Sequence, residues 1–204
     1  MIKKRKLYFL LIILIFCLTE TNGLIAGASI SERWTINLEI GNWQPHSLND
    51  DPSFETFGAA GATPYYGIAL TIPAIRDLSM KITVGYWALR DLNELENIHT
   101  LVIHPLTLDF KYWLVPDNRL SAYVLYGAGL FLGVENETLP FGEKLHNAQT
   151  GWGINLGAGF DFAFASHMGL GMTFQYHYVL FRNPLGGVDD LSGPKIMGGL
   201  LIFL

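Results

Sequence analysis

The sequence is poor in cysteine, in basic residues and in long apolar segments. Its one cysteine, Cys17, follows Phe16 where a lipoprotein signal has Gly or Ala, so we expect neither a lipid on Cys17 nor a disulfide in the chain after it. Lys and Arg number 13 against 18 Asp and Glu, which indicates no basic patch for nucleic acid. The longest apolar run, Leu7–Leu18, is shorter than the roughly 20 residues of a membrane-spanning helix. Yet 50% of the residues are apolar, and that content needs another explanation.

The N-terminus has the pattern of a secretory signal peptide. Basic residues at positions 3–6 precede the apolar run, and small residues follow it. We predict a signal peptide over residues 1–28, with cleavage after Gly23 or after Ala28. A retained helical anchor is the alternative, but the run is too short to span a bilayer.

Apolar and polar residues alternate along most of the remaining chain. Between Arg33 and Gly41, apolar residues occupy every even position, and polar residues or glycine occupy every odd one. A period of two predicts a β-strand with two different faces. Seven further segments show the same pattern, at residues 65–72, 80–86, 106–112, 121–135, 151–162, 170–180 and 196–204. Across all eight segments the even positions are apolar except for Gly198, and none is charged.

The wide apolar face of these segments requires an apolar surrounding. A soluble β-sandwich buries its apolar faces against each other and spreads charges over its outside. Here the charges lie on the opposite, odd face, so lipid is the surrounding that fits the even face. The sequence therefore predicts an all-β fold, an eight-stranded antiparallel up-and-down transmembrane β-barrel over residues 29–204.

The connections between the predicted strands alternate in length. Short links near residues 75–77, 115–118 and 165–167 alternate with predicted loops at residues 44–62, 89–98, 136–148 and 182–193. Outer-membrane barrels have short periplasmic turns and long external loops, and an even strand number places both termini on the periplasmic side. Aromatic residues fall at both ends of the strands, as two interfacial girdles require: Tyr66, Tyr86, Trp152, Tyr176 and Tyr178 at the outer end, and Trp34, Phe110, Tyr112, Phe160 and Phe162 at the inner end.

Together, the leader, the eight segments, the Tyr126-Gly-Ala-Gly129 motif and the ending Gly198–Leu204 resemble the outer-membrane protein β-barrel domain family. This family includes the small OmpA-like and OmpW-like barrels, and the resemblance covers essentially the whole mature chain. It implies an outer-membrane location and recognition of the last strand by the barrel assembly machinery. The ending departs from the usual pattern because it closes on Leu204, with the aromatic Phe203 one place early.

Charged residues of the odd face are predicted to fill the lumen. An eight-stranded barrel is just wide enough for side chains to fill it, and unpaired buried charges are costly. We therefore predict a hydrogen-bonded salt network. Glu135 is also odd-numbered and is predicted to face inward, near a loop. The alternative is a polar conduit for a small solute. The predicted network comprises Arg33, Glu39, Lys81, Asp109, Lys111, Asp161, His177 and Lys195.

Glycines and histidines could suggest other chemistry. The pairs Gly127-x-Gly129 and Gly151-x-Gly153 lie inside predicted strands with no following helix, so they indicate room for lumen side chains and not a nucleotide loop.

The six histidines have mixed parity and form no ligand cluster, and we predict no metal site. His177 is predicted to face inward near the outer rim. Some eight-stranded barrels are lipid A deacylases with a serine two residues after such a histidine, but this chain has Val179 there, which argues against an enzyme.

The predicted loops are rich in acidic residues. Their simplest interpretation is a solvated, negative surface, with weak calcium or magnesium binding shared with lipopolysaccharide phosphates as the alternative. The named loop acids are Asp50, Asp51, Glu94, Glu96, Glu137, Asp189 and Asp190.

The sequence thus predicts a non-enzymatic outer-membrane barrel. We expect its lumen to be largely plugged, its acidic loops to contact the envelope surface or a partner, and its state to be monomeric without a cofactor. Its expected partners are outer-membrane lipid, lipopolysaccharide and the assembly machinery, with no nucleic acid. A narrow small-solute channel and a lipid A-modifying hydrolase remain the alternative functions.

Overall fold

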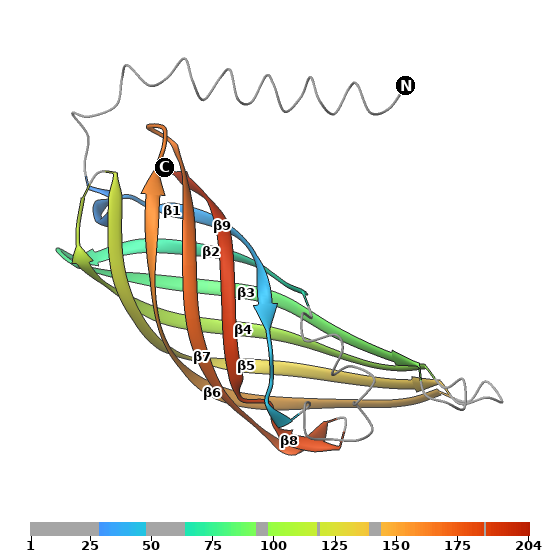
Figure 1. Cartoon of the computed structure of the whole chain (residues 1–204). Coiled ribbons are helices and arrows are strands. Elements are labelled where there is room, and N and C mark those ends of the chain that lie inside the picture. The colour runs from blue at the N-terminus through green and yellow to red at the C-terminus, as the bar shows by residue number, and fades with distance from the viewer. Residues whose placement is uncertain (1–28, 48–63, 93–97, 118, 139–143, 186) are drawn as a thin grey trace, which may run out of the picture.

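The computed structural model describes residues 29–47, 64–92, 98–117, 119–138, 144–185 and 187–204 (Figure 1). Residues 1–28, and with them the predicted signal peptide, lie outside this part. Among the described residues, no helix combines the length and the apolar character needed to cross a membrane. The elements are the 3-10 turn η2 (Ile30–Glu32) and strands β1 (Thr35–Trp43), β2 (Pro64–Ile75), β3 (Leu78–Leu92), β4 (Ile98–Val115), β5 (Leu120–Thr138), β6 (Lys144–Ala163), β7 (Met168–Leu185), β8 (Val188–Asp190) and β9 (Gly193–Phe203).

Eight long strands form one closed antiparallel sheet. Each of β1 to β7 pairs with the next strand along the chain, and β9 lies between β7 and β1. This closure confirms the predicted eight-stranded up-and-down barrel. The ninth strand, β8, is a three-residue segment that pairs only with β7, at the opposite end of the barrel from the C-terminus (Figure 1).

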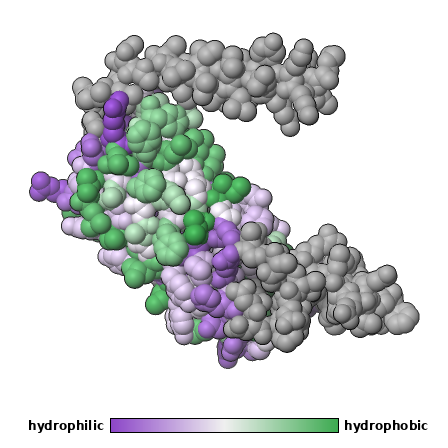
Figure 2. Space-filling view, in the orientation of Figure 1, coloured by the Kyte–Doolittle hydropathy of each residue, from purple (hydrophilic) through white to green (hydrophobic). Residues whose placement is uncertain are grey.

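The two faces of the strands differ as the alternation predicts. Even-numbered residues point outward, and Leu38, Leu108 and Leu156 are 43%, 43% and 66% exposed. Odd-numbered residues point into the lumen, where Lys81 and Asp109 are buried. Figure 2 shows hydrophobic side chains over much of the wall and hydrophilic ones gathered near its ends. This arrangement fits a wall that meets lipid.

Several strands are longer than predicted at the end where Trp43 lies, which we call the loop end. β3 continues to Leu92, β5 to Thr138 and β7 to Leu185, while β6 begins at Lys144. The prediction ended each strand where apolar alternation stopped. Beyond the bilayer the outward face no longer needs apolar residues, so the alternation ends although backbone pairing continues.

The predicted long loops are therefore partly wrong. Residues 89–92, 136–138, 144–148, 182–185 and 188–190 belong to strands, so the stretches left between β3 and β4, between β5 and β6, and between β7 and β8 are shorter than the predicted loops. In the connection from β7 to β8, Gly187 has a φ of 82°, a backbone conformation that residues with a Cβ rarely adopt.

The opposite end, which we call the turn end, holds the short turns and both described ends of the chain. Ser29 caps η2, and the backbone N–H of Ile30 donates to the Asp117 carbonyl at 3.1 Å. The N–H of Leu204 donates to the Trp34 carbonyl at 2.9 Å. The segment after the predicted signal peptide thus folds against the turn end of the barrel.

Candidate functional site in the barrel lumen

The described side chains of the lumen form three layers. At the loop end lies an apolar cluster, and a smaller apolar cluster occupies the turn end. A belt of charged and polar residues separates them. The loop-end cluster contains Trp43, Tyr65, Trp87, Leu89, Leu101, Ile103, Phe131, Val179, Phe181, Leu185, Leu191 and Met197. The turn-end cluster contains Ile30, Trp113, Tyr123, Leu125, Ala163, Leu201 and Phe203.

Two ion pairs cross the charged belt. The Lys81 ammonium lies 2.5 Å from Glu39 Oε1, and the Lys111 ammonium lies 2.6 Å from Asp161 Oδ2. All four side chains are at most 5% exposed. Such pairs must be nearly fully hydrogen-bonded, because a buried charge without a partner is strongly destabilising.

The remaining belt charges use other partners. The Asp109 carboxylate accepts hydrogen bonds from Asn155 Nδ2 at 2.8 Å and from Thr107 Oγ1 at 3.2 Å. The Lys195 ammonium lies over the Tyr65 ring, 3.4 Å from its centroid. A cation over an aromatic face in a desolvated site is a favourable contact. The belt thus holds three carboxylates and three ammonium groups.

Inward glycines make room for these large side chains. Gly85 and Gly67 lie beneath the Tyr65 side chain, and Gly159 lies beneath the Tyr123 ring. A Cβ on Gly67 would approach Tyr65 Cε1 to 3.0 Å, closer than ordinary packing allows. The predicted glycine pairs make room in the same way, because a Cβ on Gly127 would collide with the Asp109 carboxylate and a Cβ on Gly153 would approach Phe131 Cε2 to 2.9 Å.

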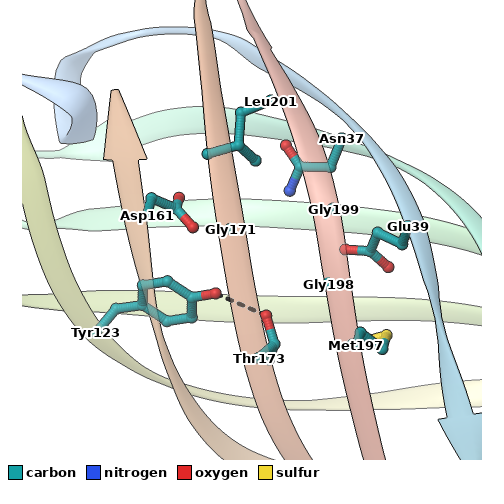
Figure 3. Close-up of a pocket in the computed structure, with 10 residues that line it drawn as sticks. All are labelled: Asn37, Glu39, Tyr123, Asp161, Gly171, Thr173, Met197, Gly198, Gly199 and Leu201. Carbon is teal, nitrogen blue, oxygen red and sulfur yellow. Dashed lines mark hydrogen bonds between the residues drawn. The ribbon is translucent and has the colours of Figure 1, made fainter. Parts of the chain in front are cut away.

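A small cavity lies inside the belt between Asp161 and Glu39 (Figure 3). Its volume is about 10 Å³, and Asn37, Tyr123 and Thr173 also line it. The Tyr123 and Thr173 hydroxyls are 2.7 Å apart. In Figure 3, Gly171 and Gly199 lie between the two carboxylates.

The position of His177 does not resemble a catalytic site. The side chain is 2% exposed, and its ring centroid lies 5.8 Å from that of Trp43 and 6.0 Å from that of Phe131. Its Nε2 lies 3.5 Å from Gln175 Oε1, at the limit of a hydrogen bond. Val179, the position of a deacylase serine, is fully buried and apolar.

Two predicted odd-face charges lie away from the belt. Arg33 is at the turn end, where its Nη1 donates to the Ser166 carbonyl at 2.8 Å and its guanidinium lies over the Phe203 ring. Glu135 is near the loop end, and its Oε2 accepts a hydrogen bond from Asn147 Nδ2 at 3.3 Å. Of the predicted network, the belt contains Glu39, Lys81, Asp109, Lys111, Asp161 and Lys195. His177 lies instead beside the rings of Trp43 and Phe131 in the loop-end cluster.

The predicted loop acids are only partly within the described residues. Asp50, Asp51, Glu94 and Glu96 lie outside them, and Glu137 is described only as part of β5. Asp189 and Asp190 belong to β8 and not to a loop, which corrects the prediction. Asp190 Oδ1 accepts a hydrogen bond from the Ser192 N–H at 2.8 Å, so this carboxylate helps to fix the chain that enters β9.

The apolar loop-end cluster is larger than the alternation pattern predicted. Trp43, Trp87, Leu101 and Ile103 were not recognised as lumen residues because the predicted strands ended too early or began too late. All four residues are odd-numbered, which is the parity of the inward face. Once the strands are extended, the same alternation places these four side chains inside.

The comparisons with known proteins agree on the architecture. No protein-family model and no curated protein matches the chain. The structure is similar to that of Neisserial surface protein A, NspA, with a TM-score of 0.52 and 12% identity over 87% of this chain and 100% of that one. It is also similar to Ail, the attachment invasion locus protein of Yersinia pestis, with a TM-score of 0.54 and 14% identity over 88% of this chain and all of that one.

Ail has also been solved in complex with the heparin analogue sucrose octasulfate, and that structure matches with a TM-score of 0.52 and 13% identity over 88% of this chain and 100% of that one. At these identities the likeness shows the fold. The chain has the fold of the small eight-stranded outer-membrane barrels, as the sequence resemblance implied.

Proposed function

We propose that this chain is a non-enzymatic, non-conducting barrel of the outer membrane that acts through its outer surface. The apolar even face and the fold shared with NspA and Ail support the location. Export through the signal peptide predicted at residues 1–28 and assembly through the last strand, β9, belong to the same proposal. So does a monomeric state.

The layered lumen is the observation that carries the proposal. Above the belt, Trp43 packs against Trp87 and Phe131, with ring centroids 5.4 and 5.9 Å apart. Below it, Trp113 packs edge-on against Tyr123 at 5.4 Å. A solute would have to pass two apolar, aromatic layers and break two ion pairs between them. This arrangement favours a plugged barrel over the alternative of a small-solute channel.

The surroundings of His177 support the absence of enzymatic activity. A general base must reach the proton that it abstracts, and the site must admit a substrate. His177 is enclosed between Trp43 and Phe131, and Val179 provides no nucleophile. The hydrolase alternative therefore has neither access nor a nucleophile at this position.

The outer surface is proposed to contact lipopolysaccharide. Among the described residues at the loop end, His46, His104, His146 and Arg182 are exposed at even, outward positions. The rings of His104 and Tyr86 are 5.5 Å apart, so this imidazole lies within the outer aromatic girdle. The Arg182 guanidinium can pair with the phosphates of the surrounding lipid, and the imidazoles can form hydrogen bonds with them.

The sulfated ligand seen with Ail is not expected to bind this chain. The sequence places several acids in the connection between β1 and β2, including Asp50 and Asp51, and like charges repel a polysulfated sugar. Titration of the purified barrel with sucrose octasulfate should show no saturable binding at physiological ionic strength. Saturable binding would shift the proposed partner toward sulfated surface sugars.

Planar-bilayer recording tests the proposal directly. The purified full-length mature barrel is reconstituted, and a porin treated in the same way serves as the positive control. We expect no steady conductance above that of the bare membrane. A reproducible open current from the folded barrel would replace the proposal with the small-solute channel.

A further inference from the structure

The apolar outward wall of the barrel is interrupted at one position. Gly198 of β9 is the one even-numbered residue of the eight alternating segments that is not apolar. On the outward face its neighbours in the sheet register are Ile40 of β1 and Met172 of β7, and Phe160 of β6 pairs with Met172. The strands β6, β7, β9 and β1 lie side by side (Figure 1). A Cβ added to Gly198 would be 4.0 Å from the nearest atom of another strand, so the wall is open there.

A groove with a volume of about 760 Å³ lies over this opening, within the roughly 300–1,000 Å³ of small-molecule sites. Gly171, Gly198 and Gly199 contribute only backbone to it. The exposed side chains of Ile40 and Phe160 line it from β1 and from β6. All the residues that line the groove are apolar or glycine.

The groove extends to the turn end of the barrel. Leu120 is the first residue of β5, and it pairs with Phe162 of β6, which also lines the groove. Arg119 directly precedes Leu120, and its carbonyl accepts a hydrogen bond from the Ala163 N–H at 2.7 Å. The Arg119 side chain is exposed. An exposed cation therefore borders the groove at the end where the barrel wall meets lipid headgroups.

We propose that this groove binds one phospholipid of the leaflet at the turn end, with an acyl chain over the glycine backbone and the phosphate beside Arg119. The inference rests on the membrane location proposed above. Water does not fill a groove whose lining is apolar. An acyl chain supplies the dispersion contacts that the lining atoms would otherwise lack. The planar guanidinium matches the geometry of phosphate oxygens.

A second copy of the chain fits the groove less well than a lipid does. Two-fold pairing places the same surface patch of both copies opposite each other. A groove at the centre of such an interface would face the other groove, and the space between them would stay empty. Association within a bilayer depends on close packing, because lipid is as apolar as the protein wall. A flexible acyl chain fills the groove without this constraint.

A second outward depression, of about 580 Å³, lies around Ala128 and extends to Trp152 of the outer aromatic girdle. All the residues that line it lie inside strands, so no turn residue borders it. Of the two depressions, the groove at Gly198 offers both an apolar channel and an adjacent cation. This combination matches the two parts of a phospholipid.

Native mass spectrometry of the full mature barrel tests the site. The barrel is purified in detergent, mixed with phosphatidylglycerol at a few lipids per barrel, and released from its micelle in the gas phase. We expect one retained lipid per wild-type barrel. Gly198→Leu, which fills the groove, should lose this lipid. Val84→Leu, on the outward face of β3 and away from the groove, should keep it.

A second pair of variants tests the phosphate contact. Arg119→Gln should weaken phosphatidylglycerol retention about fivefold, as expected for one cation near an anionic lipid surface. Arg76→Gln, an exposed arginine in the turn between β2 and β3, should leave retention unchanged. Diacylglycerol with the same chains lacks the phosphate, so its weaker retention should be the same in R119Q and in the wild type.

Three outcomes would overturn the proposal. They are a wild-type barrel that retains no lipid, unchanged retention in folded G198L, and equal losses in R119Q and R76Q. A barrel dimer that disappears in G198L would assign the groove to a second copy instead. Circular dichroism checks the folding of each variant, and the two arginine variants decide if G198L does not fold. Spin-label accessibility of the even face tests the membrane location separately, so a failure of this site would leave that location standing.

Discussion

Asn155 and Asp109 meet across a strand that separates them. In the sheet register Asp109 of β4 pairs with Gly127 of β5, which pairs in turn with Asn155 of β6. Asn155 Nδ2 nevertheless donates to Asp109 Oδ1 at 2.8 Å. The contact is possible because Gly127 has no side chain between them. Side chains of alternate strands can therefore pair inside the barrel wherever the strand between them carries glycine.

Gly127→Ala should destabilise the barrel. The new Cβ would collide with the Asp109 carboxylate and the Leu108 carbonyl, and overpacking of this kind costs roughly 1–3 kcal/mol. Unfolding by guanidinium in detergent micelles measures the loss. The matched control is Ala128→Val, on the outward face of the same strand, and it should keep the wild-type midpoint. Equal midpoints for G127A and the wild type would contradict the proposed role of the glycine.

Removing one charge of a buried ion pair should lower the free energy of unfolding more than removing both charges. Lys81→Met leaves the Glu39 carboxylate buried without its ammonium, a loss of about 3–5 kcal/mol for buried pairs. The double variant Lys81→Met, Glu39→Gln removes both charges and should recover much of this loss. Denaturant unfolding of the wild type, Lys81→Met, Glu39→Gln and the double variant forms the cycle. Additive losses would show that the two charges do not interact.

Leu156→Arg should be poorly tolerated in lipid. Leu156 is 66% exposed on the outward face of β6, near the middle of the apolar segment at residues 151–162. A charge near the bilayer midplane of a barrel costs about 2–4 kcal/mol. Leu156→Ala, which removes the same side chain without adding charge, is the control. Folding of L156R into vesicles at the wild-type yield and stability would argue that this face does not meet lipid.

The mature chain should begin at Ser29. The sequence allows cleavage after Gly23 or Ala28, and Ser29 caps η2 with its backbone nitrogen 3.3 Å from Glu32 Oε2. A terminal ammonium created at Ser29 would therefore lie beside a carboxylate. Intact-mass measurement of the exported protein distinguishes the two sites. A mature chain that starts at Leu24 would place cleavage after Gly23.

The sequence predicts the barrel well because lipid imposes a simple rule. Every even residue in the bilayer must be apolar, so residues such as Leu108 and Leu156 mark strands without knowledge of any partner. The rule ends at the membrane surface. For this reason the loop-end extensions that carry Trp87 and Leu101 were missed, and the expected loops were too long.

The lumen contacts could not be predicted from parity alone. Parity places Glu39 and Lys81 inside, but their pairing depends on the stagger of β1 and β3 and on the room left by β2 between them. The cavity beside Asp161 likewise depends on which residues of β7 and β9 are opposite it. Register is set by the closure of the whole barrel, which no single segment encodes.

Spin-label accessibility along β5 tests most directly the claim that even residues face lipid and odd residues fill a closed lumen. Cys17 lies in the predicted signal peptide, so a mature chain can carry a single introduced cysteine. Tyr126 and Leu130 are 50% and 53% exposed, whereas Leu125 and Phe131 are 0% and 1% exposed. Labels at positions 126 and 130 should relax strongly with lipid-soluble oxygen, and labels at 125 and 131 should respond neither to oxygen nor to a water-soluble nickel complex. Equal oxygen accessibility at all four positions, or strong nickel accessibility at 125 and 131, would contradict the account.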